Sequence, residues 1–193
     1  QVLLRQQAGM RKIEFDYNDP LDLIWLSAAK QVGIHVERSS EVFASWDGRG
    51  TLLIGEPETL DADDSLAQLI FHEMCHFLVE GPEAWSQADW GLENAQKDHE
   101  FACLRLQASL ADPYGLRGVL ASTTDFRTFY DQLPRDALRG DDVSAVLARQ
   151  GFERAQRSPW CEAINSALQS TLEIARVVQP LALPSSVWSR VQL

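Results

Sequence analysis

The apolar positions of this chain follow two different periods. Short alternating stretches lie mainly in its first third, and apolar residues recur every three or four positions in most of the rest. The alternating stretches predict strands over residues 12–18, 34–39, 41–46 and 50–55. Asp47-Gly48, between the last two, is typical of a hairpin turn and predicts that these strands pair with each other.

The helical stretches are bounded by recognisable start and stop signals. Asp19-Pro20 opens the first helix, and Gly81-Pro82 closes the second. Asp61, Asp63 and Asp64 crowd the start of the second helix, where we expect them to cap free backbone N–H groups. The predicted helices cover residues 20–32, 62–80, 92–111, 123–132, 142–156 and 159–178.

Together these elements predict an α+β fold that is rich in helices, with a small antiparallel or mixed sheet packed on the second helix. With 193 residues and 45% hydrophobic composition, the chain fits one domain with a single core. We expect residues 12–115 to form the core of the functional site. Residues 116–193 are expected to be a helical extension, either for packing or as a cap on the substrate side.

Composition narrows the partners and the compartment. The net charge of -11 argues against nucleic acid or an anionic membrane as the main partner, because both need clustered Lys and Arg. No apolar run approaches the length of a membrane span, and the first residues lack the apolar core of a signal peptide. The three cysteines show no CxxC spacing, so we expect free thiols and a cytoplasmic protein.

The stretch FHEMCHFLVEG, residues 71–81, carries the strongest chemical signal. His72 and His76 are four residues apart on a predicted helix, so both imidazoles lie on one face and can reach one metal ion. Glu73 lies about 100° around the helix and is placed to act as general base on a metal-bound water. Cys75 points away from this pair, and we expect it to be a buried thiol.

A catalytic metal site needs a third protein ligand and an open position. Downstream of the motif, Val79 and Pro82 stand where an extended HExxHxxGxxH motif would have Gly and His. The next predicted helix offers several alternatives close together in the sequence: Asp98, His99 and Glu100, with Glu93 before them. Helix phase does not separate adjacent residues, so the third ligand stays open at this stage.

An HExxH helix followed by a carboxylate on the next helix resembles the zincin metallopeptidases of the gluzincin kind. The resemblance implies a zincin-like domain in which His72, His76 and Glu100 bind zinc and Glu73 is the general base. It also implies an upstream edge strand that pairs with an extended peptide substrate, and TLLIG, residues 51–55, is expected to be that strand. Leu104 stands where thermolysin-type enzymes have an Asp.

The segment from His72 to Ala108 also resembles the bacterial elongation factor P hydroxylase family. The shared features are HExxH, then Gly81, then Asp89-Trp90-Gly91, and a later Glu seven residues before Gln-Ala, here Glu100 and Gln107-Ala108. This resemblance implies an iron(II) site with the same two His and one Glu, acting on a protein side chain.

The sequence therefore leaves three functions open. The first is a zinc metallopeptidase-like hydrolase acting on a peptide or protein. The second is a non-heme iron(II) hydroxylase acting on a protein. The third is a non-catalytic metal-binding or interaction domain.

Several other residues are candidates for a substrate site. Trp85 and Trp90 either line a cleft or tie down the loop that holds them. Tyr17 and Tyr114 are considered as oxyanion donors. Arg105, Arg117 and Arg127 are considered as carboxylate clamps.

Overall fold

The computed structural model describes residues 12, 14–91, 97–121 and 124–193. Its helices and strands are α1 (Pro20–Gln31), β1 (His35–Ser39), β2 (Ala44–Trp46), β3 (Thr51–Gly55), α2 (Leu66–Glu80), α3 (Lys97–Ala111), α4 (Arg127–Gln132), α5 (Val143–Ala155) and α6 (Trp160–Val178). Short 3₁₀ turns connect several of them. The predicted helix-rich α+β class is confirmed.

The three strands form one mixed sheet in the order β1-β3-β2. The hairpin predicted at Asp47-Gly48 is present, and β2 pairs antiparallel with β3, while β1 pairs parallel with β3. Because β3 lies between the other two, the expectation that residues 51–55 form an edge strand is wrong. The edge strand beside α2 and its site is β2.

The strand predicted over residues 12–18 is not formed by the described part of that stretch. Residues 14–18 are irregular, and the rings of Phe15 and Tyr17 are exposed. Alternation alone does not make a strand, because a strand also needs a neighbour to accept its backbone hydrogen bonds.

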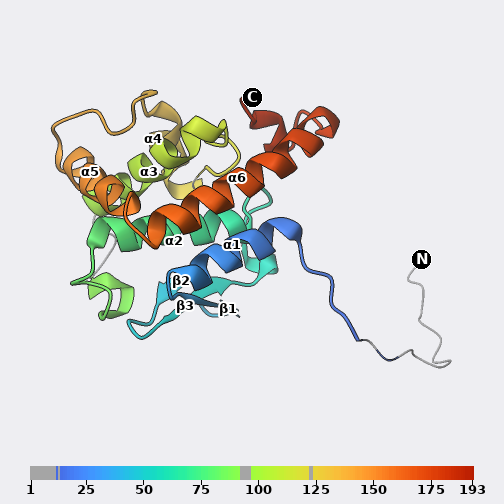
Figure 1. Ribbon diagram of the computed structural model, residues 1–193, viewed down its shortest axis with the longest axis horizontal. Helices are drawn as coiled ribbons and strands as arrows, with labels where there is room; N and C mark the ends of the chain where they lie inside the picture. Colours follow the sequence, from blue (N-terminus) through green and yellow to red (C-terminus); the bar gives the residue numbers. More distant parts are fainter. Residues whose placement is uncertain (1–11, 13, 92–96, 122–123) are drawn as a thin grey trace.

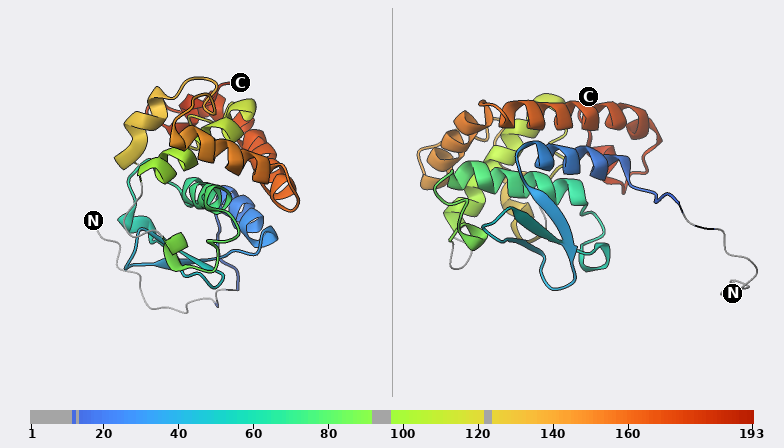
Figure 2. Two further views of the ribbon diagram at one scale, coloured as in Figure 1. Left: turned by 90° about the vertical axis from the view of Figure 1, so that its left-hand side faces the viewer. Right: turned by 60° about the horizontal axis from the view of Figure 1, so that its bottom comes forward.

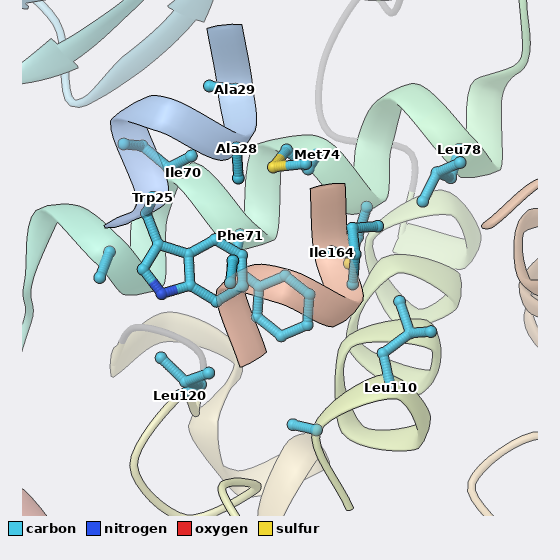
Figure 3. Close-up of a cluster of buried hydrophobic side chains, with 14 of the residues drawn as sticks. Trp25, Ala28, Ala29, Ile70, Phe71, Met74, Leu78, Leu110, Leu120 and Ile164 are labelled. Carbon is cyan, nitrogen blue, oxygen red and sulfur yellow. The ribbon is translucent and has the colours of Figure 1, made fainter. Parts of the chain in front are cut away.

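Helix α2 lies in the middle of the molecule, between the sheet on one side and α6 on the other (Figures 1 and 2). Thirteen of its 15 residues are buried, so it is covered on nearly every face. In Figure 3, Trp25 and Ala28 of α1 lie against Ile70 and Phe71 of α2. The rings of Trp25 and Phe71 are 4.7 Å apart between centroids.

The ends of α2 are set by two residues. Its N-cap is Ser65, whose hydroxyl accepts a hydrogen bond from the Gln68 backbone N–H at 3.2 Å. The expectation that Asp61, Asp63 and Asp64 cap this helix is therefore wrong: the chain still turns at these residues, and a cap must directly precede the first helical turn. Gly81 ends the helix with φ of 81°, a conformation that favours glycine.

The C-terminal third supports the back of the two central helices. Helix α5 packs against α3 and α2, and Arg154 of α5 donates hydrogen bonds to the carbonyls of Leu78 and Val79 at 2.6 and 3.0 Å. These carbonyls belong to the last turn of α2, where backbone C=O groups have no hydrogen-bond donor within the helix. Helix α6 packs along α1, where Thr171 accepts a hydrogen bond from the Trp25 indole at 3.1 Å.

Within the described residues, no helix has both the length and the apolar character needed to cross a membrane. Cys75, Cys103 and Cys161 are free thiols, and the first two are buried. The expected burial of Cys75 is confirmed.

Candidate metal centre

Helix α2 places His72 and His76 on the same face, as their spacing predicts. Their ring centroids are 4.9 Å apart, and the two planes are nearly perpendicular. His76 is buried and His72 is partly buried. The two imidazoles therefore sit at the border between the core and an open cavity.

Glu100 of α3 faces both histidines. Its Oε1 lies 3.2 Å from His76 Nε2, and its Oε2 lies 3.5 Å from His72 Nε2. Two ligands bound tetrahedrally to zinc are about 3.3 Å apart when each lies about 2 Å from the ion. The three side chains offer donor atoms within 4.8 Å of one another. Their spacing and chemistry fit a divalent zinc or iron ion.

The ring of His72 is held from behind by Gln107. His72 Nδ1 donates to Gln107 Oε1 at 3.0 Å, and Gln107 Nε2 donates to the Leu120 carbonyl at 2.7 Å. Gln107 must donate to a carbonyl with its nitrogen, so its oxygen is the atom left for His72. This arrangement directs His72 Nε2 towards Glu100.

The Asp89-Trp90-Gly91 turn covers one side of the centre. Trp90 stacks on His76 with the ring centroids 4.8 Å apart and an angle of 15° between the planes. Asp89 Oδ1 accepts hydrogen bonds from the Trp46 backbone N–H at 2.9 Å and from Ser45 Oγ at 3.0 Å. Asp89 and Trp90 both have positive φ, so this carboxylate holds a strained turn against the end of β2.

A cavity of about 340 Å³ opens in front of the three donors. Glu73 lines it beside them, and its side chain is otherwise buried. The other walls come from β2 and the residue before it, α2, the 88–91 turn and the 124–126 turn: Phe43, Ala44, Leu69, Asp89, Trp90, Asp125 and Phe126. Three donors at the floor of an open cavity leave room for a substrate group.

In the absence of a metal, burial and neighbouring charged groups shift the pKa values of the ionisable side chains in this cluster. Burial raises the pKa of Glu73 above its ordinary value. For Glu100, burial alone would raise the pKa, but hydrogen bonds from His72 and His76 hold it well below the usual range. For His76, burial would lower the pKa, but Cys103, Glu100 and Glu80 raise it well above the usual range. A bound cation would take the place of the protons shared in this cluster.

The alternatives to Glu100 lie elsewhere. His99 points to the other side, where its Nδ1 donates to Glu80 Oε2 at 2.7 Å. Asp98 is exposed and belongs to neither group of metal-binding donors that the described residues form. Glu93 lies outside the described residues. Of the candidates that the structure describes, only Glu100 is brought to His72 and His76.

Most of the other residues singled out from the sequence have structural partners. Trp90 lines the cavity, whereas Trp85 ties its loop to α2 by donating to the Phe77 carbonyl at 2.8 Å. Tyr17 is exposed, and Tyr114 donates to Asn165 at 3.3 Å, so neither lines this cavity. Arg105 and Arg117 donate to backbone carbonyls: Ala137 and Arg139 for the first, Leu133 and Pro134 for the second.

Sequence reasoning missed the side chains behind the three candidate ligands. A second group of close donors is formed by His76, Glu80 and Cys103, and Gln107 entered only through a resemblance. The available signal was spacing: Glu80 is four residues after His76, and Gln107 is seven residues after Glu100, so each shares a helix face with a ligand.

Comparison of this chain with models of known protein families, with curated proteins and with solved structures finds no match.

Proposed function

We propose that this protein is a zinc-dependent hydrolase of the metallopeptidase kind. His72, His76 and Glu100 would hold the ion, and Glu73 would move the proton. The observation that carries this proposal is the position of Glu73, which lines the same open cavity as the three donors but does not belong to their group. A hydrolase needs a base in that position.

A zinc ion held by these donors would supply a Lewis acid that lowers the pKa of water and polarises a carbonyl group. Glu73 accepts a proton from the attacking water and passes it to the leaving amine nitrogen. Its burial suits this role, because a carboxylate with a raised pKa is a stronger base and accepts a proton from water more readily near neutral pH. Trp90 keeps water from one face of His76 by stacking on it.

Strand β2 supports a peptide or protein as substrate. In its register with β3, Ala44 pairs with Ile54 as a non-hydrogen-bonded pair, so the N–H and C=O of Ala44 face away from the sheet. Ala44 also lines the cavity. An extended peptide can pair with this residue and bring a carbonyl over the donors. Asp89 already occupies the Trp46 N–H, which limits the pairing to a short segment.

A second proposal is an iron(II) hydroxylase acting on a protein side chain. It is favoured by the residues that carry the hydroxylase resemblance, because several of them converge on the centre: Trp90 stacks on His76, Asp89 holds that turn, and Gln107 orients His72. Two His and one carboxylate are also a common ligand set for iron(II) oxygenases. The same pocket would then admit oxygen and a protein side chain.

Metal analysis and one substitution separate these proposals. Protein purified without oxygen is analysed for zinc and iron and then tested on a peptide mixture. Glu73→Gln should keep the metal and lower peptide cleavage by about 10²–10⁴-fold. The exposed Glu83→Gln is the matched control and should cleave normally.

Three results contradict the hydrolase. Loss of metal in Glu73→Gln would make Glu73 a ligand. Bound iron with oxygen consumption and no cleavage would support the hydroxylase instead. Bound metal with neither reaction would indicate a metal-binding or interaction domain.

A further inference from the structure

Two buried polar atoms face each other on the side of the His76 ring that points away from Glu100. They are His76 Nδ1 and Glu80 Oε1, 3.8 Å apart, and neither has a hydrogen-bond partner among the described residues. The side chains of His76 and Glu80 are 5% and 4% exposed. A buried polar atom without a hydrogen-bond partner lowers the stability of the fold. Two such atoms that face each other therefore point to a function.

The geometry of α2 explains why these atoms meet. Glu80 is four residues after His76, so the two side chains share one helix face. The other oxygen of Glu80 is already fixed, because His99 Nδ1 donates to Oε2 at 2.7 Å. Oε1 is left for His76, and a side-chain rotation that closes the gap by about 1 Å makes a normal hydrogen bond.

We propose that Glu80 is a positioning residue for the metal centre: it accepts the Nδ1–H of His76 and so commits Nε2 to the metal. This role rests on the proposed function, since it requires that His76 binds a metal. A carboxylate behind a ligand histidine fixes its tautomer and makes it a stronger donor. His72 is held by the neutral amide of Gln107, so the two imidazoles differ in donor strength.

Cys103 is the competing partner for His76. It belongs to the same buried group of donors as His76 and Glu80. A thiol sulfur is a weak acceptor, whereas a carboxylate oxygen is a strong one. Glu80 is also on the same helix as His76, so the spacing of the pair is fixed by the helix itself, whereas Cys103 is on α3.

The test is the affinity for Zn²⁺ alone, measured by competition with a chelator. Glu80→Leu should weaken zinc binding by about 10–100-fold. Glu80→Gln keeps an oxygen acceptor and should recover most of this loss. Cys75→Ala, at a buried thiol that belongs to neither donor group, is the matched control and should bind zinc as the unmodified chain does. A merely structural role would change the unfolding free energy of the metal-free protein and leave the affinities equal.

The ring nitrogens of His76 give a second readout by NMR. In the zinc-loaded chain, Nδ1 should carry a proton in a strong hydrogen bond, and its resonance should move upfield in Glu80→Gln. The exposed His35 is the internal reference. If Glu80→Leu does not fold, the Nδ1 proton of the unmodified chain and its change in Glu80→Gln still decide the question.

The failures are distinguishable. If the unmodified chain binds no zinc, the proposed metal centre is wrong and the role of Glu80 falls with it. If the chain binds zinc and Glu80→Leu binds equally tightly, only the role of Glu80 is wrong. If the chain binds two zinc ions and Cys103→Ala loses one, His76 bridges two metals, and Glu80 is a ligand.

Discussion

At the scale of single residues, the centre depends on side chains that do not face the cavity. Gln107 is fully buried and makes two hydrogen bonds, one to His72 and one to the Leu120 carbonyl. A buried amide with both ends in use cannot rotate without losing a bond. Gln107 is therefore fixed by the backbone, and it fixes the orientation of the His72 imidazole in turn.

This arrangement predicts that Gln107→Leu weakens zinc binding by about 10–100-fold, because His72 loses the acceptor that fixes its tautomer. Chelator competition measures the loss. Gln68→Leu is a close control, since Gln68 is also buried and donates to a backbone carbonyl, that of Val119, at 2.8 Å. Both variants should lose stability, and only the first should lose zinc affinity. Equal zinc affinities would show that Gln107 does not orient His72.

The sequence was sufficient to predict that His72 and His76 share a face, because helix geometry fixes residues four apart. It did not separate Glu100 from His99. Adjacent residues differ by about 100° around a helix, and the rotation of α3 about its own axis is set by its packing on α2 and α5. The i,i+4 spacing places Glu80 on the same helix face as His76, but its role could not be predicted from the sequence, because that role also depends on burial.

At the scale of elements, the 88–91 turn links the sheet to the centre. Its conformation is unfavourable for residues other than glycine at Asp89 and Trp90, with φ of 44° and 55°. The hydrogen bonds from Ser45 and Trp46 to Asp89 hold the turn closed. Trp90 is thereby kept on His76.

We expect Asp89→Ala to lower the free energy of unfolding by about 2 kcal/mol, because two hydrogen bonds to a carboxylate are lost and alanine disfavours positive φ. Asp89→Asn should be close to the unmodified protein, since asparagine keeps an acceptor oxygen and tolerates this conformation. Urea unfolding measures both, and acrylamide quenching of the tryptophan fluorescence, compared with that of Trp90→Phe, reports whether the turn opens. An alanine variant as stable as the asparagine variant would contradict this account.

The start of α5 predicts a dependence of stability on pH. Asp142 caps this helix by accepting from the Ala145 N–H at 3.1 Å. Its pKa lies below the ordinary value of 3.8, chiefly because Ser144 donates to it, with smaller contributions from the Ala145 N–H and Arg105. A lowered pKa in the folded state means that the carboxylate stabilises the fold above pH 3.8, and that this contribution is lost as the pH falls below that value.

Asp142→Asn should therefore reduce the acid-dependent loss of stability between about pH 5 and pH 2 while keeping the cap. Asp142→Ala removes the cap and should cost about 1 kcal/mol at pH 7. Unfolding in urea at several pH values checks both statements. An unchanged acid profile in Asp142→Asn would place the acid sensitivity in other carboxylates.

Most elements could be predicted from the sequence, since periodicity and caps are local. The positions of α1, α5 and α6 agree within about two residues of the predicted bounds. The order of the strands could not be predicted. β1 pairs with β3 rather than with β2, the next strand in the sequence, so β2 lies at the outer edge of the sheet. That long-range pairing decides which strand lies beside the cavity.

At the scale of the whole molecule, the proposed metal ligands come from two helices that other elements hold together. Helices α2 and α3 pack on each other, and α5 contacts both. Gly151 of α5 lies so close to Leu106 and Val79 that an added Cβ would be 2.9 Å from the Leu106 side chain. A metal bound between α2 and α3 would therefore crosslink two helices that form much of the core.

Zinc should consequently raise the melting temperature. A ligand that binds only the folded state at 100 times its Kd stabilises by about 2.7 kcal/mol. For a chain of this length, each kcal/mol corresponds to about 2–4 °C, so we expect a rise of about 5–10 °C in differential scanning calorimetry. His76→Ala and Glu100→Ala should abolish the rise, because each removes a ligand. His35→Ala should keep it, because His35 is exposed on β1 and belongs to neither donor group. A rise that survives in His76→Ala would place the metal somewhere else in the protein.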